Sequence, residues 1–279
     1  MVLRPQPQIL MIDTDKVEDL IFLSYLTNYN LNQIHKIIGS VNNSVFESEY
    51  QKENNKRQFE ETDRTTKITI QKLKYYGVEA IPFTSAKYPK VIRKLKDFPP
   101  VLYVRGKLKN RKLAAIVGSR NASKIAPGKV LEISKSFIDG GYGIASGLAI
   151  GIDTYAHEAA INESGYTVAV LPTSLDTIYP AENFGLANKI IDRGGALLSE
   201  IPIGINRGKK SYIERNRLQT ALSDFVVPVE LGVSSGTMHT VNFCIQQGKT
   251  LLLPIPSEAT FTTFKEYYEG ILFLQNKFK

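Results

Sequence analysis

The sequence predicts an α/β protein built on a doubly wound, mostly parallel sheet and preceded by a small N-terminal helical region. Between residues 113 and 255, short apolar runs alternate with segments of helical spacing, as in βαβ units with right-handed crossovers. Of the 279 residues, 43% are apolar and 22% are charged. This composition excludes global disorder and is ordinary for a soluble globular protein.

The alternating region contains six candidate strands, each an apolar run of the kind expected for a strand buried on both faces. They span 113–118, 140–146, 167–172, 196–200, 225–230 and 250–255. Candidate helices span 129–139, 151–163, 184–193, 215–223 and 235–247. Asp153 is a predicted N-cap of the second of these helices. Because ligands of such sheets bind at the carboxyl ends of strands near a topological switch point, the loops that follow strands are the candidate site.

The remainder of the chain divides by composition. Apolar residues in 17–46 have helical spacing and predict two or three short helices around a polar break at Tyr29 and Asn30. Residues 47–67 are strongly polar and predict an exposed helix or a linker that marks a boundary. The expected organisation is given by three ranges: an N-terminal helical region with its linker, 1–67; a sheet domain, 68–255, with 68–112 as its N-terminal extension; and a C-terminal tail, 256–279.

Several classes of protein are excluded by composition. No run of about 18 apolar residues exists, so no membrane span is expected. The first 20 residues lack an apolar stretch followed by a small-residue cleavage site, so secretion is not expected. A single cysteine, Cys244, excludes an internal disulfide framework and a multi-cysteine zinc site. A reduced, cytoplasmic setting fits these features.

The positive charge is unevenly distributed. The formal net charge is +8, and residues 113–279 contain 15 basic and 15 acidic residues, so the whole excess lies in 1–112. Segment 87–112 alone has ten basic residues and one acidic residue, and segment 207–217 has five and one. Such blocks are most often solvated surface, but two in one chain favour a polyanionic partner.

The loop after the first strand, 118–123, reads GSRNAS. Gly118 permits a sharp turn off the strand, and Ser119 offers a hydroxyl. Arg120 has a planar guanidinium that can donate two parallel hydrogen bonds to a phosphate. The alternative is a helix start with an exposed arginine.

The loop after the second strand, 146–153, reads SGLAIGID. Ser146 stands at the strand end, and Gly147 and Gly151 would allow backbone amides to approach an anion at the following helix, which contains Asp153. The alternative is tight packing between strand and helix. The loop matches neither the G-x-G-x-x-G fingerprint nor the Walker A pattern.

Two further segments contribute candidates. Residues 214–217, ERNR, are predicted to open a helix. Arg215 and Arg217 are two residues apart and would diverge on one helix, but at a partly extended helix entry they could straddle a nucleic-acid backbone, with Lys209 and Lys210 as a basic rim. After the strand at 225–230, the next helix is expected to begin with a nest of backbone amides that could bind an anion. The candidate residues of this nest are Ser235, Gly236 and Thr237.

The sequence offers few combinations of residues that could catalyse a reaction or bind a metal. His157 follows Asp153 by four residues and in principle shares a metal with it, but no third ligand is evident, so a structural hydrogen bond is favoured. Cys244 lies in an apolar helix and is expected in the core. Tyr155 and Tyr179 either stack on bases or pack at the rim of the site. We therefore expect no enzyme activity, no metal and no cofactor.

These motifs, in this order, strongly resemble the DprA/Smf family of DNA-processing proteins. The resemblance covers roughly 70–254 and includes YPKVIRKLKDFPPVLYVRG upstream. It implies a Rossmann-like domain that binds single-stranded DNA in a basic pocket. It further implies homodimerisation, protection of incoming strands, and loading of the recombinase RecA during natural transformation. By match, it places Ser119 and Arg120 in a phosphate-binding pair and Asn216 between the two arginines of the family's Arg-Asn-Arg motif.

Two hypotheses follow. The first is a non-enzymatic single-stranded DNA-binding protein with RecA as its partner. The second is a nucleotide-binding or nucleotide-sensing Rossmann-like protein, possibly a nucleoside-monophosphate phosphoribohydrolase, in which Glu230 or Asp153 would act as an acid. The segment SSGTMHT lacks the Pro-Gly-Gly and the following Glu of those hydrolases, which favours the first.

Overall fold

A computed structural model describes residues 12–39 and 56–278, and these residues form two compact units. The first unit comprises residues 1–103 with 202–205, and the second comprises 104–201 with 206–279. The first 11 of the 20 residues on which the expectation about secretion rests, and the segment 40–55, predicted as helix end and linker, lie outside the described residues.

The first unit is helical at its start, as predicted. Its elements are α1 (Val17–Leu26), α2 (Leu31–Gly39), α4 (Lys56–Tyr75), β1 (Val78–Pro82), α5 (Lys90–Arg93) and the start of β2 (Val101–Gly106). The predicted break separates α1 from α2, where Asn28 and Tyr29 have φ of 47° and 57° and the Tyr29 side chain is buried. The Tyr25 hydroxyl contacts both Thr69 of α4 and the Ile203 carbonyl, so it ties three segments of this unit together.

The polar segment predicted as an exposed helix or linker is helical from Lys56 onward. Its buried face consists of residues three or four apart, as an α-helix requires. These residues are Phe59, Thr62, Thr66, Thr69 and Leu73. The Thr62 and Thr66 hydroxyls donate to carbonyl oxygens four residues earlier, which satisfies them away from water.

The second unit contains the predicted doubly wound parallel sheet. Its elements are β3 (Leu113–Val117), α6 (Ala126–Asp139), β4 (Gly143–Ser146), α7 (Ile152–Asn162), β5 (Thr167–Val170), α8 (Phe184–Asp192), β6 (Ala196–Ser199), α9 (Lys210–Leu222), β7 (Phe225–Pro228), α10 (Thr237–Gln246), β8 (Thr250–Leu251) and α11 (Glu258–Lys277). The strand order is β6-β5-β4-β3-β7-β8, and every pairing among these strands is parallel.

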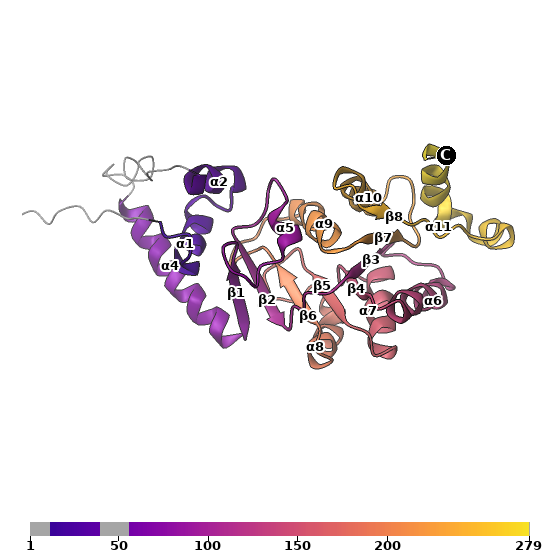
Figure 1. Cartoon of the computed structure of the whole chain (residues 1–279), viewed down its shortest axis with the longest axis horizontal. Coiled ribbons are helices and arrows are strands. Elements are labelled where there is room, and N and C mark those ends of the chain that lie inside the picture. The colour runs from indigo at the N-terminus through magenta and orange to yellow at the C-terminus, as the bar shows by residue number, and fades with distance from the viewer. Residues whose placement is uncertain (1–11, 40–55, 279) are drawn as a thin grey trace, which may run out of the picture. The chain divides into compact units, whose positions relative to one another are not determined.

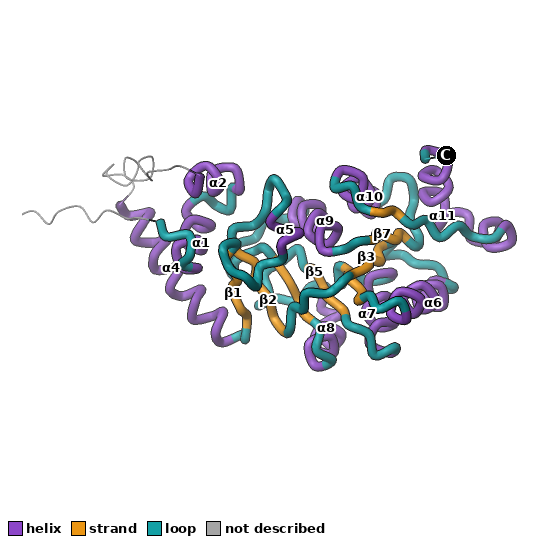
Figure 2. The backbone as a smooth tube through the Cα atoms, viewed as in Figure 1, coloured by secondary structure: helices purple, strands orange, loops and turns teal. Residues whose placement is uncertain are grey.

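The two faces of this sheet carry different helices (Figure 1). Helices α6, α7 and α8 cover one face, and α9 and α10 cover the other, as the backbone tube in Figure 2 also shows. The chain winds outward from β3 to β6 and then returns through α9 across the opposite face to β7. The direction of winding therefore reverses between β3 and β7, which makes that gap the topological switch point.

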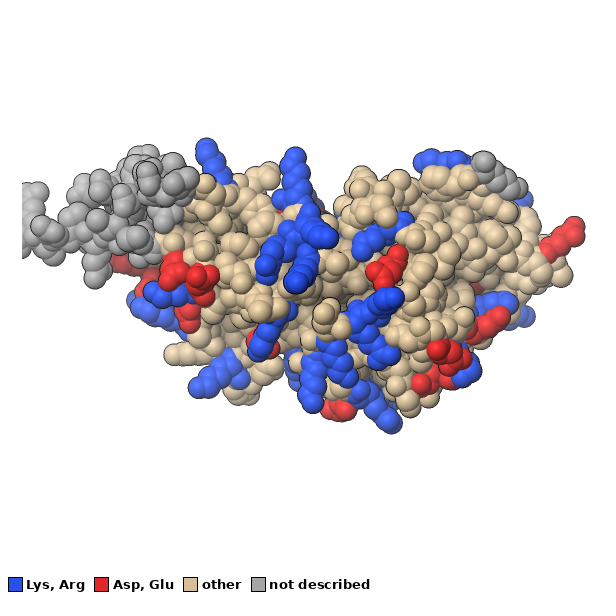
Figure 3. Space-filling model, in the orientation of Figure 1, with Lys and Arg blue, Asp and Glu red and all other residues tan. Residues whose placement is uncertain are grey.

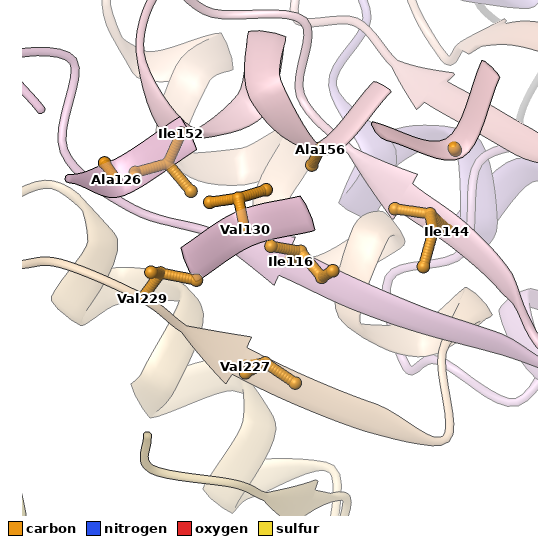
Figure 4. Packing of buried hydrophobic residues seen from close by; sticks show 9 residues of the cluster. Ile116, Ala126, Val130, Ile144, Ile152, Ala156, Val227 and Val229 are labelled. Carbon is orange, nitrogen blue, oxygen red and sulfur yellow. The ribbon is translucent and has the colours of Figure 1, made fainter. Parts of the chain in front are cut away.

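The core under α6 and α7 explains why β3 reads as a continuous apolar run. Ile116 of β3 packs with Val130 of α6, Ile144 of β4, Ile152 of α7 and Val227 of β7 (Figure 4). Each of these side chains is at most 3% exposed. Full burial of one such side chain contributes about 1.5–3 kcal/mol, so both faces of β3 must be apolar.

Several boundaries differ from those predicted, and two differences concern residues of the candidate site. Helix α9 begins at Lys210, five residues before the predicted start, so Arg215 and Arg217 lie inside the helix and do not open it. The prediction that Asp153 caps α7 was wrong: Gly151 precedes the helix, and Asp153 is its second residue. No helix in the described part of the chain is long and apolar enough to cross a membrane.

The C-terminal tail contains a helix that the sequence analysis did not predict. Tyr268, Ile271 and Leu274 are spaced three residues apart on α11 and pack against Leu231 and Val241. The approach is close because Gly270 lies here: a Cβ at this position would stand 2.6 Å from the Leu231 carbonyl oxygen. The tail is therefore part of the core of the second unit.

Replacing Ile271 by alanine tests this packing. Ile271 is fully buried, so Ile271→Ala should lower the free energy of unfolding by about 2–5 kcal/mol. Urea unfolding followed by circular dichroism measures the loss. Phe273→Ala is the matched control on the same helix, because Phe273 is 44% exposed, and it should cost less than about 1 kcal/mol. Equal losses in both variants would contradict the packing.

Candidate functional site

Two cavities lie at the carboxyl ends of the central strands of the second unit. The first, the α10 cavity, has a volume of about 400 Å³ and lies between the loop after β3, helix α9 and the start of α10. The second, the Tyr179 cavity, has a volume of about 300 Å³ and lies between the loop after β4, segment 172–180 and α9. The two share four lining residues, Arg120, Ala149, Tyr212 and Arg215. They occupy the predicted switch point.

Most of the predicted site residues border these cavities. The α10 cavity is lined by nine of them: Gly118, Ser119, Arg120, Asp153, Arg215, Asn216, Ser235, Gly236 and Thr237. Gly147 lines the Tyr179 cavity, as do Tyr179 itself and Ile150. Five predicted residues line neither cavity: Ser146, Gly151, Lys209, Lys210 and Arg217.

Arg120 is the exposed cation of the site. Its guanidinium lies over the Tyr212 ring, 5.6 Å from the ring centre. The Tyr212 ring in turn meets the edge of Tyr179, with ring centres 6.3 Å apart and planes at 86°. Within the described residues, Arg120 forms no ion pair with a carboxylate, so its charge is available to an anion.

The loop that carries Arg120 is braced from within. The Ser119 hydroxyl donates to the Asn121 carbonyl at 2.9 Å and accepts from the Asn121 amide at 3.1 Å. The Ser119 amide donates to the Glu230 carbonyl at 2.8 Å. Ser119 therefore shapes the turn beneath Arg120.

Glu230 anchors the same loop from the end of β7. Its carboxylate is buried and accepts hydrogen bonds from the Ser123 amide at 2.8 Å and the Ser123 hydroxyl at 2.5 Å. Glu230 lines neither cavity. Its carboxylate thus fixes the backbone and the side chain of Ser123, at the start of the segment that leads to α6.

Arg215 is buried at the ends of two neighbouring strands. Its Nη1 donates to the carbonyl oxygens of Gly147, at 2.9 Å, and of Val170. Burial lowers the pKa of Arg215 below its ordinary value, although the charge of Asp153 opposes this effect. Only part of this side chain borders the cavities, since the residue is 7% exposed.

Asp153 is the partner of Arg215 under the loop after β4. Its carboxylate accepts from the Ala149 amide at 3.3 Å. Burial raises the pKa of Asp153 above its ordinary value, and the positive charge of Arg215 acts in the opposite direction. For both partners the loss of hydration outweighs the attraction between them.

The glycines of this loop allow side chains and backbone to come close. A Cβ on Gly147 would stand 2.5 Å from Arg215 Nη1 and 2.6 Å from Asp153 Oδ2. Gly151 has a φ of +86°, and a Cβ there would collide with the carbonyl oxygens of Ser119 and Arg120. The tight packing that was the alternative for this loop is therefore present.

Arg217 lies away from both cavities. It forms a buried, two-pronged ion pair with Glu200, with both N–O distances at 2.7 Å. The two arginines diverge because residues two apart on a helix face different sides. The prediction that Arg215 and Arg217 open a helix and straddle a backbone was wrong for this reason.

The other predicted residues outside the cavities have different surroundings. The Ser146 hydroxyl is buried and donates to the Ile116 carbonyl at 2.7 Å. Lys209 and Lys210 are exposed at the start of α9, where Lys210 lies 3.4 Å from Glu214. The part of the basic segment in this unit, 104–112, also borders neither cavity. Figure 3 shows that many Lys and Arg side chains project from the face it displays.

The cavities also contain residues that the sequence analysis missed. Helix α9 contributes Tyr212, Ile213 and Gln219, and α10 contributes Thr240. Tyr212, Arg215 and Gln219 are spaced by three and four residues, so they share one face of α9. An earlier predicted start for this helix would have revealed the shared face.

The remaining histidine and cysteine predictions are confirmed. His157 Nδ1 lies 2.7 Å from the Thr167 hydroxyl, which itself donates to the Ile144 carbonyl. The hydroxyl therefore accepts from His157 Nδ1–H. Cys244 is buried, and burial raises the pKa of its thiol to about 11. Among the described residues, no group of three or more His, Cys, Asp or Glu is placed to hold a metal ion.

The sequence profile of the family described as DNA recombination-mediator protein A matches residues 79–267, more than half of the chain. The chain belongs to this family.

Curated relatives match more than half of the chain. Protein Smf of Borreliella burgdorferi is 35% identical over 166 residues, which is 59% of this chain and 53% of the relative. Protein Smf of Escherichia coli is 35% identical over 179 residues, 63% of this chain and 48% of the relative. The DNA processing protein DprA of Bacillus subtilis is 34% identical over 177 residues, 62% of this chain and 59% of the relative. The chain spans about half the length of these relatives.

Two solved structures of family members share the fold. DprA from Streptococcus pneumoniae has a TM-score of 0.70 at 26% identity, covering 95% of this chain and 88% of that one. DprA from Helicobacter pylori, whose structure is described for its single-stranded DNA binding mode, has a TM-score of 0.57 at 27% identity. That match covers 72% of this chain and 95% of the Helicobacter chain.

The environment of His157 predicts a dependence of stability on pH. Burial, with the nearby charge of Arg215, lowers the pKa of His157 from 6.5 to about 3. The unfolded chain then takes up a proton at this site below about pH 6.5 while the folded chain does not, so stability is lost as pH falls. The free energy of unfolding should be about 1.4 kcal/mol lower at pH 5.5 than at pH 7.5 through this group.

Urea unfolding at the two pH values, compared between the native chain and His157→Asn, measures this contribution. Asparagine keeps a donor for Thr167 but does not titrate, so the variant should lose about 1.4 kcal/mol less between the two pH values. His239→Asn is the control, since His239 is exposed. An identical pH dependence in the native chain and His157→Asn would show that His157 does not titrate in this way.

Proposed function

We propose that this chain binds single-stranded DNA at the two cavities, without chemical turnover, and that it protects incoming strands during natural transformation. The observation that carries the proposal is the exposed Arg120 guanidinium over Tyr212, where both cavities meet. A planar cation beside aromatic rings suits a polymer that alternates phosphates and flat bases.

In this proposal, different groups of the site contact different parts of the strand. A phosphate would lie on Arg120, which has no carboxylate partner among the described residues. A base would stack on Tyr179, which is 52% exposed and borders the second cavity. Stacking of this kind tolerates any base, because each base has a π face.

Membership of the family supports the biological part of the proposal. The Helicobacter relative, which shares the fold, is described as binding single-stranded DNA. From the family resemblance we extend the proposal to loading of RecA onto the bound strand, to a homodimer as the working form, and to a cytoplasmic location.

The geometry gives less support to a nucleotide hydrolase. The acid proposed for that reaction, Glu230, is buried, is bonded to Ser123 and lines neither cavity. Asp153 does line the α10 cavity, but it accepts a hydrogen bond from the Ala149 amide and lies in the field of the positive charge of Arg215. Competition by mononucleotides in the binding experiment below addresses the nucleotide-sensing alternative.

Arg120→Ala should weaken binding of a fluorescent single-stranded oligonucleotide about tenfold near 0.1 M salt, because a charge-assisted phosphate contact is lost. It should also reduce the slope of log affinity against log salt by about 0.7, the value for one phosphate on a single strand. Fluorescence anisotropy across a salt series measures both quantities.

Arg193→Ala is the matched control, because Arg193 is exposed in the same unit and borders neither cavity. It removes the same charge and should change affinity less than twofold. If Arg120→Ala and Arg193→Ala have equal effects, the cavities are not where the phosphates bind. If a mononucleotide displaces the oligonucleotide at a far lower concentration than unlabelled DNA does, the nucleotide-sensing alternative is favoured.

A further inference from the structure

The loop that carries Arg120 is attached to Glu230 at two points. On one side of Arg120, the Ser119 amide donates to the Glu230 backbone carbonyl at 2.8 Å. On the other side, the Glu230 carboxylate accepts from the Ser123 amide at 2.8 Å and from the Ser123 hydroxyl at 2.5 Å. Both attachments come from a single residue at the end of β7, so the position of Glu230 determines the position of the loop.

Glu230 and the residue after it are held in turn by helix α11. The Leu231 amide donates to the Tyr267 carbonyl at 3.0 Å, and the Leu231 carbonyl accepts from the Gly270 amide at 2.9 Å. The Tyr268 side chain is 3% exposed and forms a hydrogen bond with the Glu230 carboxylate. Burial, with the adjacent charge of Glu230, raises the pKa of Tyr268 to about 12, so its hydroxyl keeps its proton and donates.

Helix α11 also reaches the chain on the far side of the loop. The helix is kinked at Phe264, where φ is −127° and ψ is 32°. The Lys124 ammonium, one residue after Ser123, lies 5.9 Å from the centre of the Phe264 ring. A cation above an aromatic ring at an exposed site is a weak contact, so the hydrogen bond between Tyr268 and Glu230 is the main link from α11 to the loop.

We propose that Tyr268 and Glu230 are positioning residues of the DNA site, through which the C-terminal helix holds the Arg120 guanidinium in place to meet a phosphate. This inference rests on the proposed binding of single-stranded DNA. Neither residue lines a cavity, so each acts through the loop and not by touching the strand there. A loop fixed before binding loses less conformational freedom when the ligand arrives, which increases affinity.

Two substitutions test the link. Tyr268→Phe removes only the hydroxyl and keeps the ring that packs against Leu231 and Val241. Glu230→Gln keeps the size of the side chain and an acceptor for Ser123 but removes the charge. Near 0.1 M salt, Tyr268→Phe should weaken binding of the fluorescent single-stranded oligonucleotide about threefold, and Glu230→Gln about fivefold, because a misplaced Arg120 loses part of its phosphate contact. Fluorescence anisotropy measures both, and circular dichroism shows whether each variant is folded.

The same substitutions in an Arg120→Ala background separate positioning from a general structural role. With the guanidinium absent, there is nothing left to position, so each should change affinity less than about 1.5-fold there. In the native background, Tyr268→Phe should also reduce the slope of log affinity against log salt, by less than the value of about 0.7 expected for Arg120→Ala. Loss of stability alone does not produce this dependence on Arg120.

Tyr166→Phe is the matched control. Tyr166 is 4% exposed in the same unit, and its hydroxyl accepts from the Lys109 amide and donates to the Lys107 carbonyl, both at 2.9 Å. It immediately precedes β5, at the edge of the sheet opposite the cavities. Tyr166→Phe therefore also removes a bonded, buried hydroxyl and should lower stability to urea, yet change affinity less than about 1.5-fold.

The outcomes distinguish this inference from the proposed function. Native affinity in Tyr268→Phe and Glu230→Gln overturns positioning and leaves DNA binding standing, and Tyr268→Phe decides alone if Glu230→Gln does not fold. Equal losses in the native and Arg120→Ala backgrounds also overturn it, as does an equal loss in Tyr166→Phe. Absence of oligonucleotide binding by the native chain, or native affinity in Arg120→Ala, overturns the proposed site and its positioning together.

Discussion

The burial of Arg215 at the carboxyl ends of β4 and β5 is the constraint around which the site is arranged. Its guanidinium bonds the carbonyl oxygens at the ends of two strands, and the charge of the nearby Asp153 carboxylate favours its protonated form. A charge taken out of water needs such partners, since the loss of hydration is large. The loop after β4 therefore passes close to the guanidinium, and only glycine fits at position 147. The outer cation, Arg120, is left for a ligand because the inner one is fully engaged.

Much of the second unit follows from local sequence, because parallel strands covered on both faces must be continuously apolar. In that setting the run LAAIVG is interpreted as a buried strand, and the structure places β3 there. The switch point follows as well, because crossovers of fixed hand place successive helices on one face until the winding reverses. The loop with Arg120 was identified by the same reasoning, since it follows a buried strand. The hydrophobic periodicity of the strands and the fixed hand of the crossovers were thus enough to predict the strand ends at which the cavities lie.

The failures have a different origin. The start of α9 was misplaced because Lys210–Glu214 contains no apolar periodicity that marks a helix, and the burial of Arg217 depends on Glu200, which is distant in sequence. The buried face of α4 contains three threonines, so the segment reads as polar, although the helix itself satisfies the hydroxyls of Thr62 and Thr66 and the Tyr25 hydroxyl contacts that of Thr69. Helix α11 has clear spacing but lies beyond the last strand, after the family motifs that the sequence analysis identified. Contacts between distant segments decided each case.

The divergence of Arg215 and Arg217 has a consequence for mutational scans. One arginine points toward the cavities and the other forms its ion pair with Glu200 on another side of the same helix, so α9 is held from two directions by buried charge. A substitution at either position would leave a strand-end carbonyl or a carboxylate without its partner. Loss of function after either substitution would therefore indicate first that the packing of α9 has changed. Arg120 is exposed, lies over the Tyr212 ring and forms no ion pair among the described residues, so a functional defect there can be interpreted as a lost ligand contact.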